Sequence, residues 1–296
     1  MPRPDVARLG IGYRRIPLLA IGRDVYLDTR LQLQKLEALD IPAPRLGSSE
    51  ADHRAIERLL SSFMTDAGVF GWAASLLPSD LPLLKDPAFQ KDREEFSGVK
   101  RTPDTVARVR PVALRELASV FKLLETTLLA DNREWILNTP SPSLADIEAI
   151  FPLHWMVGVP GALPKDKFSP EVYPKVYAWI GRFDNAVKAA GKKLGKQPKI
   201  SGEEASKFIV GSQYHESEIG VDKTDHEVVS LGLAKGDPVV VGPTDSGRTG
   251  IDNGRLVGIG AEEVVYETGG ADGAVRVHAP RHGFRIRKGK GDEGKL

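Results

Sequence analysis

The hydrophobic pattern near the N-terminus predicts a small β-β-α unit. Apolar residues run over 16–20 and 25–27, and the polar turn 22–24 separates them, a pattern that favours two short strands. Leucines at helical spacing then predict a helix over 30–39. Two strands and one helix bury too little apolar surface to fold alone. This unit therefore needs a partner.

The period of the pattern changes to that of helices in the middle of the chain. A linker rich in Pro, Gly and Ser follows residue 39, and apolar residues then recur at helical spacing from 52 to about 182. Within this block, Ser143 followed three residues later by Asp146 predicts a helix start. There the hydroxyl accepts from a backbone N–H and the carboxylate reaches back. The middle block is predicted to be all-α.

The last third of the chain has a different character. Residues 203–219 have a helical pattern, and short strands separated by turns are predicted from 228 onward. Asn253-Gly254 and Asp272-Gly273 predict hairpins, because both central residues of the favoured two-residue turn need positive φ. The pattern indicates a small β-rich domain, as a compact barrel or curled sheet.

These patterns divide the chain into segments. The expected boundaries are 1–40 for the β-β-α unit, 52–190 for the all-α domain, 203–288 for the β-rich domain and 289–296 for a disordered tail.

The composition excludes several classes of protein. A formal net charge of +1 supplies no global field to attract nucleic acid or an anionic membrane. Cysteine is absent, which excludes disulfides, thiolate metal ligands and a cysteine nucleophile. No apolar run approaches the roughly 20 residues that cross a bilayer, and the N-terminus lacks the apolar core of a signal peptide. We expect a cytoplasmic protein with no nucleic-acid or membrane partner.

Other candidate sites have simpler explanations. His278 and His282 are four residues apart, but Pro280 between them excludes the helix that such a ligand pair needs, so no metal is expected. Asp245, Ser246 and His278 lack the nucleophile elbow of a catalytic triad. The glycine-rich stretch that begins at residue 242 lacks the Gly-Lys-Ser/Thr ending of a phosphate loop.

The order of these segments resembles a known family. The stretch "RRIPLLAIGRDVYLDT", the Ser143/Asp146 helix start and the helix "YPKVYAWIGRF" are similar to the glutathione S-transferase (GST) family, most of all to a fungal branch, over residues 13 to about 187. The resemblance implies an α+β fold, with a partial thioredoxin-like β-β-α unit, an all-α domain of the GST C-terminal type and a small β-rich C-terminal domain. In the family a β-α-β half precedes residue 13. Here it is missing, which indicates a late start of the given chain or a real loss.

The resemblance implies a glutathione site. Ile16-Pro17 matches the family's cis-proline, where the backbone of the residue before the proline pairs with the cysteinyl backbone of glutathione. Asp28-Thr29 matches the acidic and hydroxyl pair that holds the γ-glutamyl carboxylate at a helix N-terminus, which is itself a good anion site. The simpler alternative is that Pro17 ends a strand and that Asp28 and Thr29 cap a helix.

The reactive centre departs from the family pattern. Family enzymes lower the thiol pKa of glutathione with a Tyr, Ser or Cys near the first strand or first helix. Tyr13 is the candidate here, although it lies just before the proline strand. The substrate pocket is expected at Phe63, Phe70 and Trp72, unless these aromatic side chains pack in the core, as the stripe that Phe63 continues favours.

Three functions stay open. The first is conjugation of glutathione to a small hydrophobic electrophile, or glutathione-assisted conversion of it. The second is glutathione-independent isomerase, dehydratase or lyase chemistry in fungal secondary metabolism, and the third is a non-catalytic binding module. The unpaired edge of the strand at 16–20 predicts a homodimer.

Overall fold

The computed structural model describes residues 3–100 and 102–289. By its contacts the chain forms two compact units. The first, here called the terminal unit, combines residues up to 39, residues 91–99 and residues from 198 onward. The second, the helical unit, consists of residues 40–90 and 100–197. The chain therefore leaves or enters the terminal unit four times, at the ends of these segments. The predicted tail falls largely on residues 290–296, which lie outside the described residues.

A seven-stranded sheet forms the centre of the terminal unit. Its strand order is β1-β2-β6-β5-β4-β3-β7. All neighbours are antiparallel except β2 and β6, which run parallel with Val25 opposite Val277. The strands are β1 (Leu19–Ile21), β2 (Asp24–Tyr26), β3 (Pro238–Pro243), β4 (Asp252–Ile259), β5 (Glu263–Gly270), β6 (Gly273–Pro280) and β7 (Phe284–Lys288).

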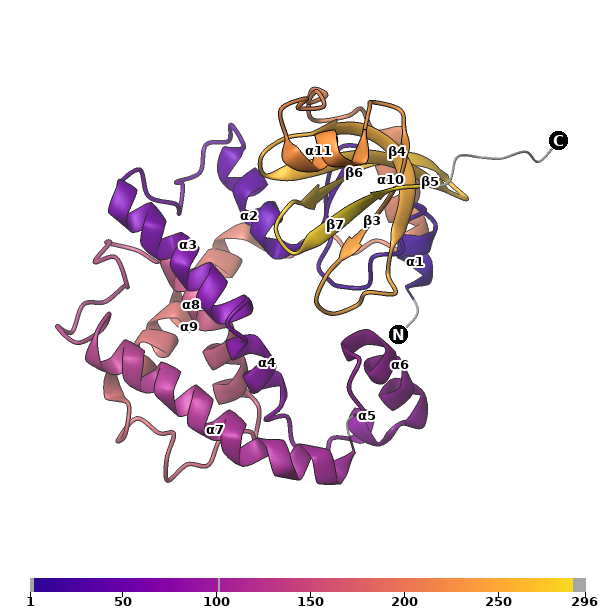
Figure 1. The fold of residues 1–296 in the computed structure, drawn as a ribbon. Coiled ribbons are helices and arrows are strands. Elements are labelled where there is room, and N and C mark those ends of the chain that lie inside the picture. The colour runs from indigo at the N-terminus through magenta and orange to yellow at the C-terminus, as the bar shows by residue number, and fades with distance from the viewer. Residues whose placement is uncertain (1–2, 101, 290–296) are drawn as a thin grey trace. The chain divides into compact units, whose positions relative to one another are not determined.

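The N-terminal β-β-α unit obtains its core from the end of the chain. The indigo N-terminal segment lies among the orange and yellow strands in Figure 1. Ile11, Val25 and Leu27 are buried in one cluster with Tyr266 and Val277. The helices of the whole terminal unit are α1 (Pro4–Ala7), α2 (Thr29–Ala38), the part of α6 (Pro87–Ser97) from residue 91, α10 (Gly202–Gly211) and α11 (His226–Leu231). The C-terminal strands thus supply the partner that the N-terminal pattern lacks.

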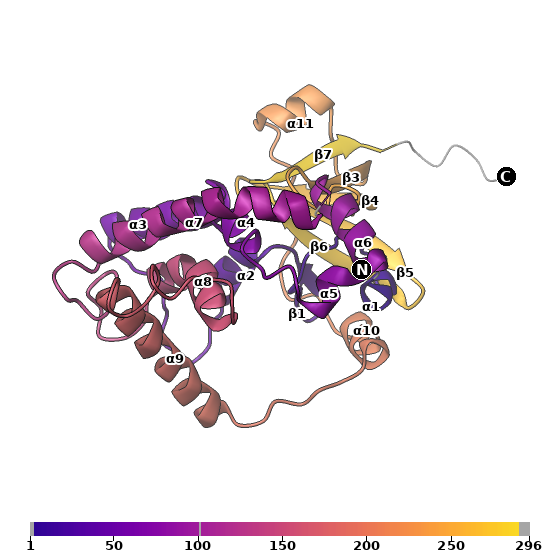
Figure 2. The same cartoon turned by 90° about the horizontal axis from the view of Figure 1, so that it is seen from below.

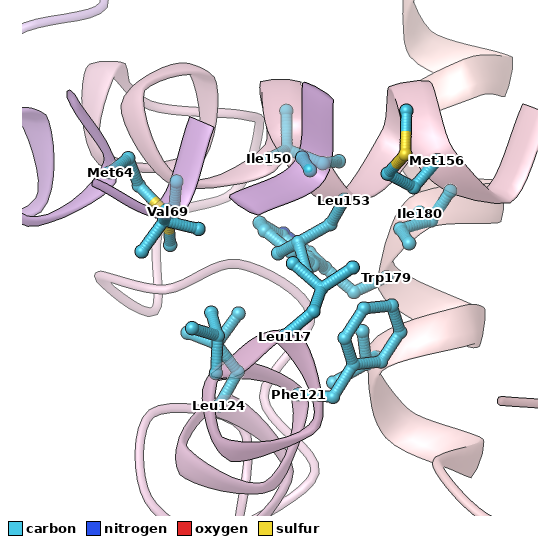
Figure 3. Close-up of a cluster of buried hydrophobic side chains, with 14 of the residues drawn as sticks. Met64, Val69, Leu117, Phe121, Leu124, Ile150, Leu153, Met156, Trp179 and Ile180 are labelled. Atoms are coloured by element: carbon cyan, nitrogen blue, oxygen red, sulfur yellow. The ribbon is translucent and has the colours of Figure 1, made fainter. Parts of the chain in front are cut away.

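The helical unit packs around its own apolar core. Leu117 and Phe121 of α7 meet Leu153 of α8 and Trp179 of α9 there (Figure 3). Helices α8 and α9 lie on one side of the layer that α3, α4 and α7 form (Figure 2). None of the described helices is both long enough and apolar enough to cross a membrane. The helices are α3 (Ala51–Thr65), α4 (Val69–Ala74), α5 (Pro82–Lys85), α7 (Pro103–Thr126), α8 (Leu144–Gly158) and α9 (Pro174–Leu194).

The predicted helix start at Ser143 is confirmed. Ser143 is the N-cap of α8, and its backbone N–H donates to the Asp146 carboxylate at 2.9 Å. The same carboxylate accepts from the backbone N–H of Ile136 at 2.9 Å and from the indole nitrogen of Trp179 at 2.8 Å. Asp146 therefore caps one helix and joins it to two other segments, which explains how a fully buried carboxylate is accommodated.

The hairpin predicted at Asn253-Gly254 is wrong. Both residues lie inside β4, where Asn253 is opposite Val240 of β3. Gly254 serves close packing, because a Cβ there would lie 2.5 Å from the carbonyl oxygen of Glu267 on β5. The second predicted hairpin is confirmed, since β5 and β6 pair up to Gly270 opposite Gly273.

The helix predicted over 203–219 ends earlier, at Gly211 of α10. The backbone N–H groups of His215 and Glu216 donate instead to the Asp24 carboxylate of β2, at 2.6 and 2.9 Å. A contact with a distant strand thus replaces the last helical turns.

Candidate functional site

The segment from the loop before β1 to the start of α2 places Ile16, Pro17, Asp28 and Thr29 within one small unit. The Ile16-Pro17 peptide bond is cis, and the Ile16 side chain is 62% exposed. Gln32 of α2 donates from Nε2 to the carbonyl oxygens of Pro17 and Tyr26, at 2.9 and 3.0 Å. One buried amide therefore holds the proline loop and the end of β2 against the same helix.

Asp28 forms the start of α2. Its carboxylate accepts from the backbone N–H of Arg30 at 3.1 Å, and its φ of 64° lies in the left-handed region that few residues other than glycine adopt. Such outliers concentrate at ligand sites, where the surrounding structure holds them. Thr29, the first residue of α2, is exposed. The Thr29 side chain at the first position of α2 is thus open to solvent.

Two guanidinium groups flank the Asp28 carboxylate. Arg15 Nη1 and Arg30 Nε each lie 3.6 Å from one of its oxygens. Arg15 also donates from Nη2 to the carbonyl oxygen of Ser246 at 2.7 Å and pairs with the Asp245 carboxylate. These contacts fix Arg15 between α2 and the loop that follows β3. The two guanidinium groups at the start of α2 are thus balanced by the carboxylates of Asp28 and Asp245.

Tyr13 is not placed as a thiol activator would be. Its side chain is 2% exposed, and its ring packs on Phe284 with the ring centroids 5.6 Å apart. Burial raises the pKa of Tyr13, and the nearby Asp28 carboxylate raises it further. Neither its hydroxyl nor Arg15 Nε has a hydrogen-bond partner in the described part of the chain. A group that must donate to a solvent-exposed thiolate needs access that Tyr13 lacks in this structure.

The three aromatic residues expected in a substrate pocket have different positions. Phe63 and Trp72 pack against the core of the helical unit, and both are partly buried. Phe70, on α4 beside Trp72, is 44% exposed. Its ring lies 5.8 Å from that of Phe151 and 5.7 Å from that of Trp155, the latter in stacked geometry.

The hydrophobic pattern did not indicate these neighbours of Phe70. Phe151 and Trp155 are four apart on α8 and therefore lie on one face of that helix. His154 is next to both, and its Nε2 lies 2.8 Å from an oxygen of Asp184 on α9. The spacing of Phe151 and Trp155 was readable from the sequence, but the pairing of His154 with a residue 30 positions away was not.

A separate cavity of about 740 Å³ lies in the helical unit. It is formed by α7 and the segment that precedes α9. Its walls are largely apolar, with Leu114, Phe168 and Tyr173 among them. The charged lining residues are Arg110, Arg115, Lys167 and Asp166. None of the residues that we expected in the pocket lines this cavity.

Three side chains of the kinds that bind metal ions also lie close together in the terminal unit. Ligand atoms of Glu216, Glu263 and His278 lie within 4.8 Å of one another. The Lys35 ammonium donates to both glutamates at 2.7 Å, so a cation already lies between the two carboxylates. Both ring nitrogens of His278 face carboxylates, which leaves no lone pair for a metal. This donor set therefore does not fit a metal ion. His278 has a structural position, whereas His282 is exposed.

Comparisons with known proteins show a similar fold. Residues 72–192 match a domain of unknown function (DUF7962). The structure is similar to that of a GST-like protein from Pseudomonas syringae, with a TM-score of 0.64 and 24% identity, over 98% of this chain and 86% of that chain. No curated protein matches the sequence.

Weaker similarities exist to two further crystal structures. For the glutathione S-transferase Blo t 8, the TM-score is 0.44 and the identity 13%, over 63% of this chain and 71% of that chain. For the β-etherase LigF from Sphingobium sp. strain SYK-6, the values are 0.41 and 19%, over 57% and 74%. The chain thus has an α+β, GST-like fold with an additional β-rich C-terminal region. A shared fold does not transfer an activity.

Proposed function

We propose that the start of α2 binds glutathione and that the protein acts as a GST-like enzyme on a small hydrophobic electrophile. One observation carries the proposal. The Ile16-Pro17 loop and the start of α2, with Asp28 and the exposed Thr29, belong to one unit that Gln32 ties together. The cis-proline loop offers backbone groups to a peptide, and the helix start offers N–H groups to a carboxylate.

The start of α2 supports an anionic ligand end. Arg15 and Arg30 balance the Asp28 and Asp245 carboxylates, and the positive end of the helix dipole then favours a further carboxylate beside the exposed Thr29. The γ-glutamyl end of glutathione carries such a carboxylate. It also carries an ammonium group, which is able to donate a hydrogen bond to the Asp28 carboxylate. The ligand class is thus a γ-glutamyl peptide.

Glutathione binding is tested by calorimetric titration. We expect glutathione to bind and cysteinylglycine, which lacks the γ-glutamyl group, to bind more weakly. Thr29→Val removes the hydroxyl at constant shape and should weaken glutathione binding by about 1–3 kcal/mol, while Thr29→Ser retains it. Thr126→Val, at an exposed site in the helical unit, is the matched control. Equal affinity for the two peptides contradicts the assignment.

A second candidate function rests on the pair of His154 and Asp184. The Asp184 carboxylate orients His154 through Nε2, which leaves Nδ1 as a candidate base. His154 lies on α8 between Phe151 and Trp155, whose rings contact that of Phe70. Such a group of residues suits proton abstraction from a flat, apolar substrate. This is the chemistry of a GST scaffold used for glutathione-independent isomerisation or elimination.

A probe for proton transfer separates the two candidates. 5-Nitrobenzisoxazole reacts by a single proton abstraction, and its ring is flat. If His154 acts as a base, His154→Gln should abolish any elimination above the buffer rate, and His53→Gln in the same unit should not. If Phe70→Ala no longer binds the probe, the probe binds at the aromatic side chains of Phe70, Phe151 and Trp155. Without elimination or probe binding, but with glutathione binding, the first function stands. A protein that binds but converts nothing is the non-catalytic module.

A further inference from the structure

A buried histidine joins the two ends of the terminal unit. His278 of β6 is 1% exposed. Its Nε2 lies 3.1 Å from an oxygen of Asp24 on β2, and its Nδ1 lies 2.9 Å from an oxygen of Glu263 on β5. The imidazole therefore bridges an N-terminal strand and a C-terminal strand, and it does so beside the one parallel contact between described neighbouring strands.

The geometry determines the protonation state of this ring. A carboxylate accepts hydrogen bonds, and a neutral imidazole has only one N–H to donate. A neutral His278 would turn a lone pair toward one of the two carboxylates at hydrogen-bond distance, inside the protein. Both contacts are favourable only when both nitrogens carry a proton.

Neighbouring groups do not replace the proton. Lys35 of α2 already donates to Glu216 and to Glu263, at 2.7 Å each. The hydroxyl of Tyr26 on β2 donates to Glu216 at 2.9 Å. The ammonium group is thus committed to the two glutamates and is not in contact with Asp24.

Charges balance only with a protonated ring. Arg276 of β6 lies with Nε 3.3 Å from Asp24 and donates from Nη1 to the carbonyl oxygen of Glu216. Three carboxylates therefore face one ammonium, one guanidinium and the imidazole. Loss of the proton from His278 leaves a net negative charge in a largely buried group, a state that is costly in a low-dielectric surrounding.

We propose that protonated His278 is a pH-dependent lock that holds residues 19–39 against the C-terminal strands, and that loss of its proton loosens this contact. The lock consists of His278 with Asp24 and Glu263, supported by Lys35, Arg276 and Glu216. The proposal does not depend on any ligand.

The direction of the pH effect follows from the shifts of the pKa. Burial acts to lower the pKa of His278, but hydrogen bonds to Asp24 and Glu263 outweigh it and hold the pKa above the ordinary value of 6.5. A group whose folded-state pKa is raised stabilises the fold fully below its unfolded pKa, and this contribution is lost as pH rises through the folded-state pKa. The lock is thus complete below about pH 6.5 and weakens above it.

The lock also reaches the candidate glutathione site, a step that rests on the proposed function. Asp24 lies on β2, which ends two residues before Asp28. Lys35 lies on α2, the helix that Thr29 begins. Loosening these elements disorders the start of α2. Glutathione affinity should therefore fall over the same pH range in which the lock opens.

The protonation state is tested first on the unmodified protein. The chain has six histidines, and ¹⁵N-labelled imidazole signals separate the protonated ring from both neutral tautomers. His278, assigned by through-bond connection of its ring to the backbone signals of the unmodified protein, should show two protonated nitrogens at pH 6. A neutral tautomer at pH 6 overturns the proposal.

Hydrogen exchange tests the lock itself. After correction for intrinsic rates, protection of β2 and β6 should fall as pH rises from 6 to 9, by up to about tenfold per pH unit, the limit for one proton. Exchange in α8 of the helical unit is the internal control. His278→Gln should remove the slope, and His282→Gln, the same change at an exposed histidine, should retain it. A flat profile in the unmodified protein, or an unchanged slope in His278→Gln, contradicts the lock.

The ligand step has a separate outcome. If exchange shows the lock and glutathione fails to bind at any pH, the proposed function fails while the lock stands. If glutathione binds with an affinity independent of pH while exchange shows the lock, the coupling to the start of α2 is wrong.

Discussion

Trp179 and Asp146 are joined by a hydrogen bond of 2.8 Å from the indole nitrogen to the carboxylate, in the interior of the helical unit. The same oxygen accepts from the backbone N–H of Ile136 at 2.9 Å, and the other oxygen accepts from Ser143. One side chain thus connects α8 and α9 with the segment that follows α7. Its loss should affect the whole unit.

Asp146→Asn should destabilise the helical unit by about 2–3 kcal/mol, because an amide cannot accept from all of these donors and leaves one unpaired in the interior. All four tryptophans lie in the helical unit, so the midpoint of urea denaturation read by tryptophan fluorescence reports on it alone. Asp80→Asn, at an exposed position of the same unit, should leave the midpoint unchanged. Equal midpoints in the two variants would show that Asp146 contributes no more than a surface residue.

Asp252→Asn should loosen the N-terminal segment of the terminal unit. The Asp252 carboxylate accepts from the backbone N–H groups of Gly12 and Tyr13, at 2.5 and 3.2 Å, and from the hydroxyl of Tyr266 at 2.5 Å. An amide must turn an N–H toward one of these donors, at a loss of about 1–3 kcal/mol. We expect faster hydrogen exchange over residues 8–14.

Asp237→Asn is the control for this change. Asp237 pairs with Lys288 at 3.0 Å, but both side chains are partly exposed, and such a pair contributes about 1 kcal/mol or less. Its substitution should leave exchange over residues 8–14 as it is. If both variants protect this segment equally well, the contact between Asp252 and Gly12 does not hold it.

Acid should weaken the terminal unit by a second route. Burial acts to raise the pKa of Asp24 and of Glu263, but hydrogen bonds from His278 outweigh it and lower both below their ordinary values of 3.8 and 4.5. A lowered folded-state pKa stabilises the fold above the unfolded pKa, and this contribution is lost as pH falls through the folded-state value. Protection of β2 and β6 from exchange should therefore fall below about pH 4.

The acid loss is specific to these carboxylates. Asp24→Asn and Glu263→Gln should each reduce the steepness of the acid transition, whereas Asp237→Asn should leave it nearly as it is. An acid transition of the same steepness in all three variants would assign it to other groups.

Conjugation should be slow at neutral pH and should accelerate as pH rises. Tyr13 is buried with a raised pKa. Without a donor for the thiolate, bound glutathione would keep a thiol pKa near about 8.5. The rate with 1-chloro-2,4-dinitrobenzene, measured from pH 6 to 9 and corrected for the uncatalysed reaction, checks this. A fast rate that does not change with pH would mean that another residue activates the thiol, and Tyr13→Phe is then the first variant to measure.

A homodimer is expected from the edge of the sheet. In the described part of the chain, β1 is an edge strand, and the exposed Ile16 lies just before it. Unpaired strand edges with apolar neighbours favour pairing with a second copy. Light scattering at micromolar concentration should give twice the mass of 32.2 kDa. Ala20→Lys, which adds a charge to the exposed edge, should shift the mass toward that of a monomer, whereas a monomer in the unmodified protein contradicts the prediction.

Local patterns predicted the local elements well. The two short strands, the start of α2 and the capping of α8 by Ser143 each depend on a few neighbouring residues, so periodicity and side-chain chemistry contain the necessary information. The fold class followed from the family resemblance. The hairpin prediction at Gly254 was wrong, because both a turn and a close approach to β5 favour glycine and the sequence does not distinguish them.

The long-range contacts could not be predicted. The parallel pairing of β2 with β6 joins residues that no local pattern connects, and hydrophobic alternation states which face is buried but not which strand is the neighbour. For the same reason His278 was compared with His282 and Ser246, which are near in sequence, whereas its partners include Asp24, 254 residues away. The position of Asp28 and Thr29 at the start of α2 depends on local capping and was predicted, whereas the contacts of Phe70 depend on the packing of α4 on α8.

The joining of the two chain ends in one sheet has a consequence during synthesis. β2 leaves the ribosome early, but His278 follows Asp24 by 254 residues, so at roughly 5–20 residues per second the strand waits for about 13–50 s before its partner is made. The helical unit, complete by residue 197, can fold during this interval. Throughout that time the apolar residues of β2 and α2 lack the neighbours that the C-terminal strands provide, and such transiently exposed apolar surface is prone to aggregation.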